Sequence, residues 1–244
     1  MAAAKRLQKI LEMLAKRYEA EGKKAELTDL LDPFQLGAWY ILGQHAKRNG
    51  QPRAYDALRR AKGVTPGKLL EITAEKLATI CQLAGPYDDA RARELYAYAD
   101  QVEEKCGQDF GKIFKSQAEA RKFLETEMKR SREFIDFLLL YGGRFPIFAL
   151  DARIVRVATR LGFGKLKSEK DLDDKSYREL QKSLESEAPR DIPGLIRAHS
   201  LLHRHGAELC HATAPACEQC PAMKECLYVK KHPITPKETP HAQH

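Results

Sequence analysis

Four cysteines near the C-terminal end have the residue type and spacing best suited to chemistry. They are Cys210, Cys217, Cys220 and Cys226, in the pattern C-x6-C-x2-C-x5-C. Four thiolates in so short a segment can surround one metal centre, and an all-sulfur ligand set favours an iron–sulfur cluster, with zinc as the alternative. Buried free thiols are a third interpretation, but the complete spacing argues against it.

The composition is that of an ordinary globular protein with a basic balance. The 244 residues suffice for one large domain or two small ones, and the net charge of +8 suits a polyanionic partner. No apolar run approaches the length of about 20 residues that spans a bilayer. The N-terminus lacks a secretion signal, so we expect a cytoplasmic protein, nucleoid-associated in a prokaryote, whose cysteines are ligands rather than disulfides.

The elements that must position these groups are predicted to be helices. Apolar residues recur at helical spacing along most of the chain, and Asp32-Pro33 is a typical helix start. No strand-like alternation is evident, so the fold class is all-α. The predicted helices cover residues 3–20, 33–48, 53–61, 66–71, 73–83, 88–105, 116–141, 151–161, 174–186 and 191–206, with a break at 49–52.

Several segments together resemble one known family. The cysteine block follows His205-Gly206, and the sequence at 149–157 reads ALDARIVRV. These segments are similar to the cluster loop and the V-D-T-H-V-x-R-V segment of the endonuclease III branch of helix-hairpin-helix DNA glycosylases. Residues 32–36 and 83–93 resemble the family's opening helix and its GLY-x-x-KA turn, so the resemblance spans roughly residues 30–228.

The resemblance implies two helical domains flanking a DNA-binding cleft, with a C-terminal loop that holds a [4Fe-4S] cluster. A helical barrel domain would cover 28–145, and a cluster domain 1–27 plus 146–230. Residues 231–244 are predicted to be a disordered tail. The expected partner is damaged double-stranded DNA, bound by a monomer without any membrane contact.

Asp151 is the residue that the resemblance marks for catalysis. The matching aspartate of the family stabilises positive charge that develops on the sugar as a damaged base departs, and it helps to orient the nucleophile. From the sequence alone Asp151 is also a helix N-cap, because Ile154, Val157 and Ala158 continue one apolar face behind it. Both roles can hold at once.

The hairpin motif of the family is degenerate in this chain. Counted back from Asp151 without a gap, the motif L-P-G-V-G-R-K falls on residues 127–133, where both glycines are missing. Those glycines allow the tight turn that presents amide groups to a DNA phosphate. Phosphate contacts are therefore assigned to Lys129, Arg130 and Arg132, with a solvated helix face as the alternative.

Glu133 occupies the position of the lysine with which lyase-competent members attack the sugar. A carboxylate cannot form a Schiff base, so strand cleavage by that route should be absent and water should be the nucleophile. Lys129, one turn earlier, could substitute for the lysine. Alternatively, Glu133 and Asp151 could form an acid–base pair.

The opening helix supplies candidates for contact with an extruded nucleotide. Gln44 or His45 could fill the gap that the nucleotide leaves, and Tyr40 could stack on the base. Tyr40 is equally well explained as a core aromatic residue.

The helix before the cysteine loop carries His199, His203 and His205. A surface or capping role is favoured over metal binding, because no third ligand follows from the pattern. Cys81 and Cys106 lie far from the loop, and Cys81 is expected to be an inert buried thiol.

The leading functional hypothesis is therefore a monofunctional base-excision DNA glycosylase. The alternative is a non-catalytic DNA-binding paralogue that recognises distorted or damaged DNA.

Overall fold

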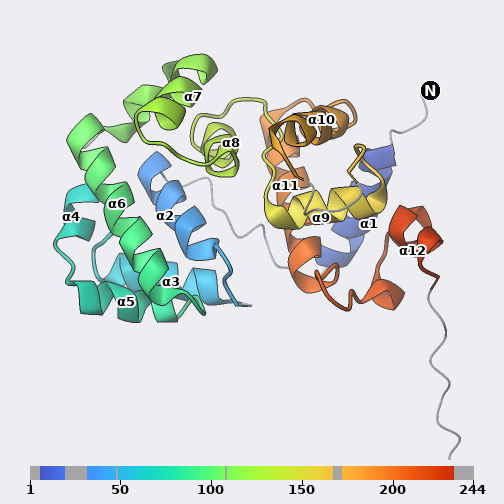
Figure 1. Ribbon diagram of the computed structural model, residues 1–244, viewed down its shortest axis with the longest axis horizontal. Coiled ribbons are helices and arrows are strands. Elements are labelled where there is room, and N and C mark those ends of the chain that lie inside the picture. The colour runs from blue at the N-terminus through green and yellow to red at the C-terminus, as the bar shows by residue number, and fades with distance from the viewer. Residues whose placement is uncertain (1–5, 20–31, 48, 108, 167–171, 234–244) are drawn as a thin grey trace, which may run out of the picture. The chain divides into compact units, whose positions relative to one another are not determined.

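The computed structural model describes residues 6–19, 32–47, 49–107, 109–166 and 172–233, which form helices joined by loops (Figure 1). Within these ranges there is no strand, which confirms the predicted all-α class. The chain divides into two compact units. Unit 1 comprises residues 1–23, 150–189 and 198–244, and unit 2 comprises 24–149 and 190–197.

Unit 1 is built on apolar faces that the sequence pattern predicts. In α1 the buried residues include Leu7, Ile10, Leu11 and Leu14, which recur at helical spacing, and in α9 the residues of one apolar face are buried beyond Asp151. Its main helices are α1 (Arg6–Tyr18), α9 (Ala152–Leu161), α10 (Asp174–Glu185) and the greater part of α11 (Ile192–Glu208). The cysteine loop adds the short elements η3 (Cys217–Gln219), η4 (Met223–Glu225) and α12 (Leu227–Lys231).

Unit 2 begins where the sequence predicts a helix start. Asp32 caps α2 by accepting a hydrogen bond from the Gln35 N–H at 2.9 Å, and Pro33 is the first helical residue. The helices of this unit are α2 (Pro33–Gly43), α3 (Gly50–Arg60), α4 (Pro66–Leu70), α5 (Ala74–Gln82), α6 (Asp88–Cys106), η1 (Phe110–Lys115), α7 (Gln117–Thr126) and α8 (Arg132–Tyr141).

Tyr98 of α6 lies at the centre of the unit 2 core. Its ring stacks on Phe34 at 5.1 Å between centroids and meets the edge of Phe134 at 5.6 Å, and its hydroxyl donates to the Pro33 carbonyl. A Cβ at Gly37 would lie 2.2 Å from the Tyr98 oxygen, so only glycine fits there. This tyrosine therefore ties α6 to both α2 and α8.

The prediction of one continuous helix over 116–141 is wrong. The structure breaks it between α7 and α8, where Lys129 adopts the left-handed conformation at φ 50° and Ser131 caps α8 through the Phe134 N–H. The Arg130 N–H returns to the Leu124 carbonyl at 3.0 Å and closes the turn. Lys129 occupies the position of the first hairpin glycine, so a helix–turn–helix shape survives without that glycine.

Two smaller boundaries also differ from the prediction. The opening helix ends at Gly43. Residues 50–52, which were predicted to be a break, form the first turn of α3. The Gln51 side-chain amide donates to the Trp39 carbonyl at 2.8 Å and so links α3 to α2. Helix α11 continues through Gly206 to Glu208. A Cβ at Gly206 would lie 2.8 Å from the Cβ of Arg153, so this glycine permits the close approach of α11 to α9.

In the described residues no helix is long and apolar enough to cross a membrane. Of the predicted tail at 231–244, residues 234–244 lie outside the described part of the chain.

The hairpin turn yields a stability prediction. We expect Lys129→Gly to raise the free energy of unfolding by about 0.5–1 kcal/mol, because glycine adopts a positive φ without the steric cost that a Cβ imposes. Lys122→Gly, in the exposed interior of α7, is the matched control and should lower stability by about 1 kcal/mol. Urea unfolding of both variants measures the two effects, and a loss of stability in Lys129→Gly would contradict the turn geometry.

Candidate functional site: an anionic aspartate and a four-cysteine loop

Asp151 is held at both carboxylate oxygens. Oδ1 accepts a hydrogen bond from the Ile154 N–H at 2.8 Å, which makes Asp151 the N-cap of α9 as the sequence predicts. Oδ2 is hydrogen-bonded to Nδ1 of His203 on α11. The side chain as a whole retains 18% exposure.

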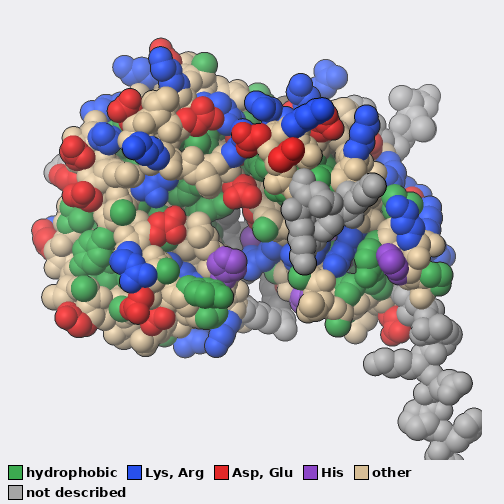
Figure 2. Space-filling view, viewed as in Figure 1, with side chains coloured by type: hydrophobic (Ala, Val, Ile, Leu, Met, Phe, Trp, Pro, Cys, Tyr) green, Lys and Arg blue, Asp and Glu red, His purple; other side chains and the backbone are tan. Residues whose placement is uncertain are grey.

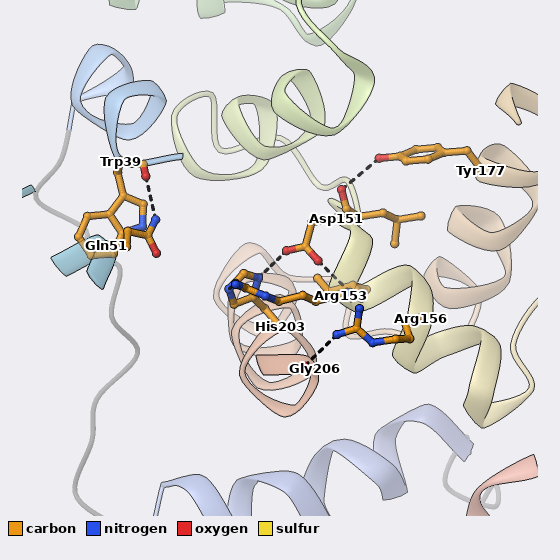
Figure 3. A network of polar contacts seen from close by, with 10 residues as sticks. Trp39, Gln51, Asp151, Arg153, Arg156, Tyr177, His203 and Gly206 are labelled. Carbon is orange, nitrogen blue, oxygen red and sulfur yellow. Dashed lines mark hydrogen bonds and ion pairs between the residues drawn. The ribbon is translucent and has the colours of Figure 1, made fainter. Parts of the chain in front are cut away.

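His203 is itself held from its other ring nitrogen. Nη1 of Arg153 lies 2.7 Å from His203 Nε2, so three side chains form a chain that runs from Arg153 through His203 to Asp151. Figure 3 shows these three residues converging from α9 and α11, with Tyr177 of α10 donating to the backbone carbonyl of Leu150 just before the aspartate.

The surroundings of Asp151 favour its charged form. Burial alone would raise the pKa of the carboxyl, but His203, the nearby His199 and the Ile154 N–H outweigh burial and hold the pKa well below its usual range. Asp151 is therefore a carboxylate at every pH at which the protein would work.

The favoured role of the three histidines, surface or capping, is wrong for two of them. His199 and His205 are only 6% and 3% exposed. Burial disfavours the imidazolium and lowers the pKa of each to about 4, so both are neutral at pH 7. His203 is half-buried and stacks on His199 at 6.0 Å between ring centroids.

Helix α9 also fastens the cysteine loop. Arg156 donates to the carbonyls of Gly206 and Cys210 at 2.9 and 2.8 Å. Arg160 donates to the carbonyls of His211 and Ala212 at 2.6 and 2.9 Å, and its guanidinium lies 4.8 Å from the centre of the Tyr228 ring. The one helix that Asp151 caps therefore also orders the backbone between α11 and the loop.

The four loop cysteines line one pocket. The other residues that line this pocket are mainly apolar. Within the described part of the chain, no three His, Cys, Asp or Glu side chains are close enough to hold a single metal ion. Four soft sulfur donors around one pocket fit an iron–sulfur group by their chemistry.

Neighbouring groups already approach the sulfur atoms. Arg160 Nη1 lies 3.5 Å from Cys210 Sγ, and His205 Nε2 lies 3.5 Å from Cys220 Sγ, while the other nitrogen of His205 meets the Tyr18 hydroxyl at 3.0 Å. Burial raises the pKa of the Cys220 thiol to about 11. This thiol is therefore protonated without a metal, and binding of a cluster would have to displace its proton.

The predicted phosphate-binding residues fall into two groups. Lys129 is exposed at the hairpin turn, and Arg132 begins α8 and is half-buried. Arg130 instead points inward: its side chain is 11% exposed, it donates to the Gln101 side chain at 2.5 Å, and it lies 5.1 Å from the centre of the Tyr98 ring. Arg130 therefore packs the hairpin onto the core and is poorly placed to reach a phosphate.

Glu133 is half-buried in the first turn of α8. Tyr40 is also half-buried and packs against Phe134 and Phe137 at 5.3 and 5.1 Å between ring centroids, as a core aromatic residue does.

The loop after α2 presents an exposed pair of rings. His45 has φ 52°, Tyr87 has φ 68° and is 65% exposed, and their ring centroids are 5.5 Å apart. The buried Arg91 guanidinium holds both loops, because it donates to the carbonyls of Gln44 and Pro86 at 2.7 and 3.0 Å. Left-handed backbone at two non-glycine residues is costly and is often kept where a loop has a function.

Charge alone does not locate a nucleic-acid contact. Acidic and basic side chains are interspersed over the face of unit 2 seen in Figure 2. The excess positive charge of the chain is thus not concentrated on that face, so net charge does not mark a DNA-binding surface there.

Sequence reasoning missed the contacts that link Arg153 through His203 to Asp151 in unit 1, and the ring contact of Tyr87 in unit 2. The spacing of His199 and His203 by four residues does place them on one helical face, and this was the available signal. Their partner Asp151 lies 52 residues away from His203, a pairing that no local pattern reveals.

Comparison with known proteins finds distant relatives. No family model matches the chain. It is 23% identical over 200 residues to endonuclease III of Thermotoga maritima, which covers 82% of this chain and 85% of that protein. It is 26% identical over 168 residues to endonuclease III of Rickettsia conorii, which covers 67% and 70% of the two chains.

Solved structures share the fold. A trapped covalent intermediate of endonuclease III with DNA matches at a TM-score of 0.67 and 21% identity, covering 93% of this chain and 97% of that one. A thermostable thymine-DNA glycosylase matches at 0.67 and 19% identity, covering 92% and 97%. The protein is thus a distant homologue of endonuclease III over most of its length and has its fold.

The Asp151 contacts predict a pH-dependent stability. Asn at position 151 can still cap α9, but it has one acceptor where Asp151 uses two, so we expect Asp151→Asn to lower the free energy of unfolding by about 1–3 kcal/mol at pH 7. The folded pKa of Asp151 is depressed, so the advantage of the wild type should be complete above about pH 4 and shrink as the pH falls below that.

Denaturant unfolding of both proteins between pH 7 and pH 2.5 provides the measurement. A difference that is constant over this range would show that the charge of Asp151 contributes nothing.

Proposed function

We propose that this distant homologue of endonuclease III is a base-excision DNA glycosylase that uses water, assisted by Asp151, to release a damaged base from duplex DNA. The observation that carries the proposal is the Asp151 carboxylate, which is kept anionic and is held at both oxygens, on a side chain that keeps 18% exposure. A fixed negative charge stabilises an oxocarbenium-like sugar and can orient a water molecule.

The hairpin supports DNA binding by this protein. The turn between α7 and α8 leads into the N-terminus of α8, and Lys129 and Arg132 lie at this end. Amide groups at a helix N-terminus and nearby cations suit a phosphate. The missing hairpin glycines and the missing lysine both favour a non-catalytic paralogue, and the retained turn weakens the first of these two arguments.

Glu133 supports a monofunctional mechanism. It stands where the resemblance expects a lysine, and its carboxylate cannot form an imine with the sugar. Lys129 lies in the turn before α8 and has a left-handed backbone. It is therefore not placed one helical turn ahead of Glu133, as a substitute for the lysine would have to be. A water nucleophile activated beside Asp151 needs neither residue.

The loop pair His45 and Tyr87 supports extrusion of a nucleotide. An exposed phenol and imidazole in contact offer flat surfaces that can stack on bases, and Arg91 keeps both loops in place. Gln44, whose carbonyl Arg91 holds, is the other candidate for filling the gap. Tyr40 packs in the core against Phe134 and Phe137.

The four cysteines that line this pocket would hold a [4Fe-4S] cluster, with zinc as the alternative. When bound, the cluster would order the loop at 210–226 and supply no step of the hydrolysis. The protein would act as a monomer in the cytoplasm, associated with DNA.

The cluster assignment predicts the metal content. Purified protein should be brown and contain about four iron atoms per chain, and Cys220→Ser should lose iron and stability, because cluster binding contributes to folding. Cys106→Ser, a buried thiol outside the loop, is the control that should retain iron. One zinc ion per chain, and no iron after anaerobic purification, would contradict the assignment.

The catalytic role of Asp151 is tested on a panel of lesion-bearing duplexes. We expect Asp151→Asn to slow base release about 10²- to 10⁴-fold with little change in DNA affinity, because only the transition state loses the charge. Asp173→Asn, which alters another helix-capping aspartate of unit 1, is the matched control and should leave the rate unchanged.

Borohydride should trap no covalent product in the same reactions. Trapping that survives Lys129→Ala would reveal a different lysine as nucleophile. If neither wild type nor Asp151→Asn releases any base while both bind DNA equally, the protein is the non-catalytic alternative.

A further inference from the structure

We propose that His203 is a positioning residue for Asp151, and that Arg153 confines His203 to the one neutral tautomer that can serve this purpose. The catalytic meaning of the inference rests on the proposed function of Asp151. Its structural content, the tautomer and its cause, can be measured without any substrate.

The tautomer follows from which groups can donate. Arg153 Nη1 lies 2.7 Å from His203 Nε2, and a guanidinium has no lone pair to offer. His203 Nε2 must therefore accept, which leaves the ring proton on Nδ1. Nδ1 faces Oδ2 of Asp151, so the N–H donates to the carboxylate. A second proton on Nε2 would bring two N–H groups face to face, which this contact disfavours.

These contacts orient the Asp151 carboxylate and leave its negative charge in place. Oδ1 is fixed by the Ile154 N–H and Oδ2 by His203, so the carboxylate plane cannot rotate freely. A cation paired directly with Asp151 would compete with the positive charge that develops on the sugar. An intervening neutral imidazole supplies the hydrogen bond and keeps the guanidinium one ring away.

The second histidine next to this chain adds no charge at pH 7. The groups that face His203 are Asp151 and Arg153 from α9 and, on its own helix, His199. His199 is buried and stacks on His203 with an angle of 16° between the rings. Burial lowers the pKa of His199 to about 4 and so makes it neutral at pH 7. Its packing restricts tilting of the His203 ring.

Two substitutions of His203 test the roles of its two ring nitrogens one at a time. The amide of Asn places a donor close to the position of Nδ1, whereas the amide of Gln reaches that of Nε2. We expect His203→Gln to slow single-turnover base release about 10- to 100-fold, the range found when the partner that orients a functional side chain is lost. His203→Asn should recover most of the rate, and the affinity for DNA should change little in either variant.

Nitrogen-detected NMR of histidine-labelled protein supplies the readout that is independent of activity. Of the eight histidines, the His203 signal is assigned by its loss in His203→Asn. The wild type should show a protonated Nδ1 and a bare Nε2 at pH 7. Arg153→Met should mix in the other tautomer or the imidazolium, and Arg153→Lys, which still donates, should restore the wild-type pattern.

Arg178→Met, which removes an exposed arginine of α10, is the matched control and should leave the His203 signal unchanged. A protonated Nε2 in the wild type overturns the inference whatever the activity, as does an unaltered tautomer in a folded Arg153→Met variant. Equal rates in the Asn and Gln variants overturn the positioning role. The expected tautomers in a wild type that releases no base would refute the proposed function and leave the role of Arg153 supported.

Discussion

The arrangement of unit 1 depends on one set of hydrogen bonds. Backbone carbonyls at the end of α11 have no partner within the helix, and side chains of another helix must donate to them. The carbonyls of Gly206, Cys210, His211 and Ala212 receive hydrogen bonds from arginines of α9. Arg153, Arg156 and Arg160 recur at intervals of three and four, so one face of α9 carries all three guanidiniums. Because Asp151 caps this same helix, the position of the acid and the course of the cysteine loop are fixed together, and a displacement of α9 would disturb both.

The hairpin shows that a backbone shape can outlast the residues that usually make it. Lys129 accepts a left-handed conformation whose steric cost glycine would avoid, and this cost is offset by contacts around it. Arg130 lies against Tyr98 and Phe134 and donates to Gln101, and Met128 is buried. Tertiary packing thus supplies what local propensity does not, which is why residues 127–131 form a turn although none is glycine or proline.

The sequence was sufficient for features that depend on local pattern. The helix starts at Asp32 and Asp151 follow from capping chemistry, and the class follows from the apolar period. Ser131 was an available capping signal inside the predicted long helix, but the helix-forming residues around it concealed the turn. The burial of His199 and His205 and the contact between His203 and Asp151 depend on how α9 meets α11, and that is decided by Gly206 and long-range packing. A repeating pattern of apolar residues in the sequence cannot predict a contact of this kind.

The two roles of Asp151 need not compete, because they use different atoms. Capping engages Oδ1 and fixes how far the carboxyl stands from the helix axis, which a longer glutamate side chain could not do with the same bond. Oδ2 and the exposed fraction of the side chain remain for His203 and for a substrate. The amides at the N-terminus of α9 also favour negative charge at this point, so the feature that stabilises the helix helps to keep the carboxylate ionised. A stable cap and a reactive anion are therefore two consequences of one placement.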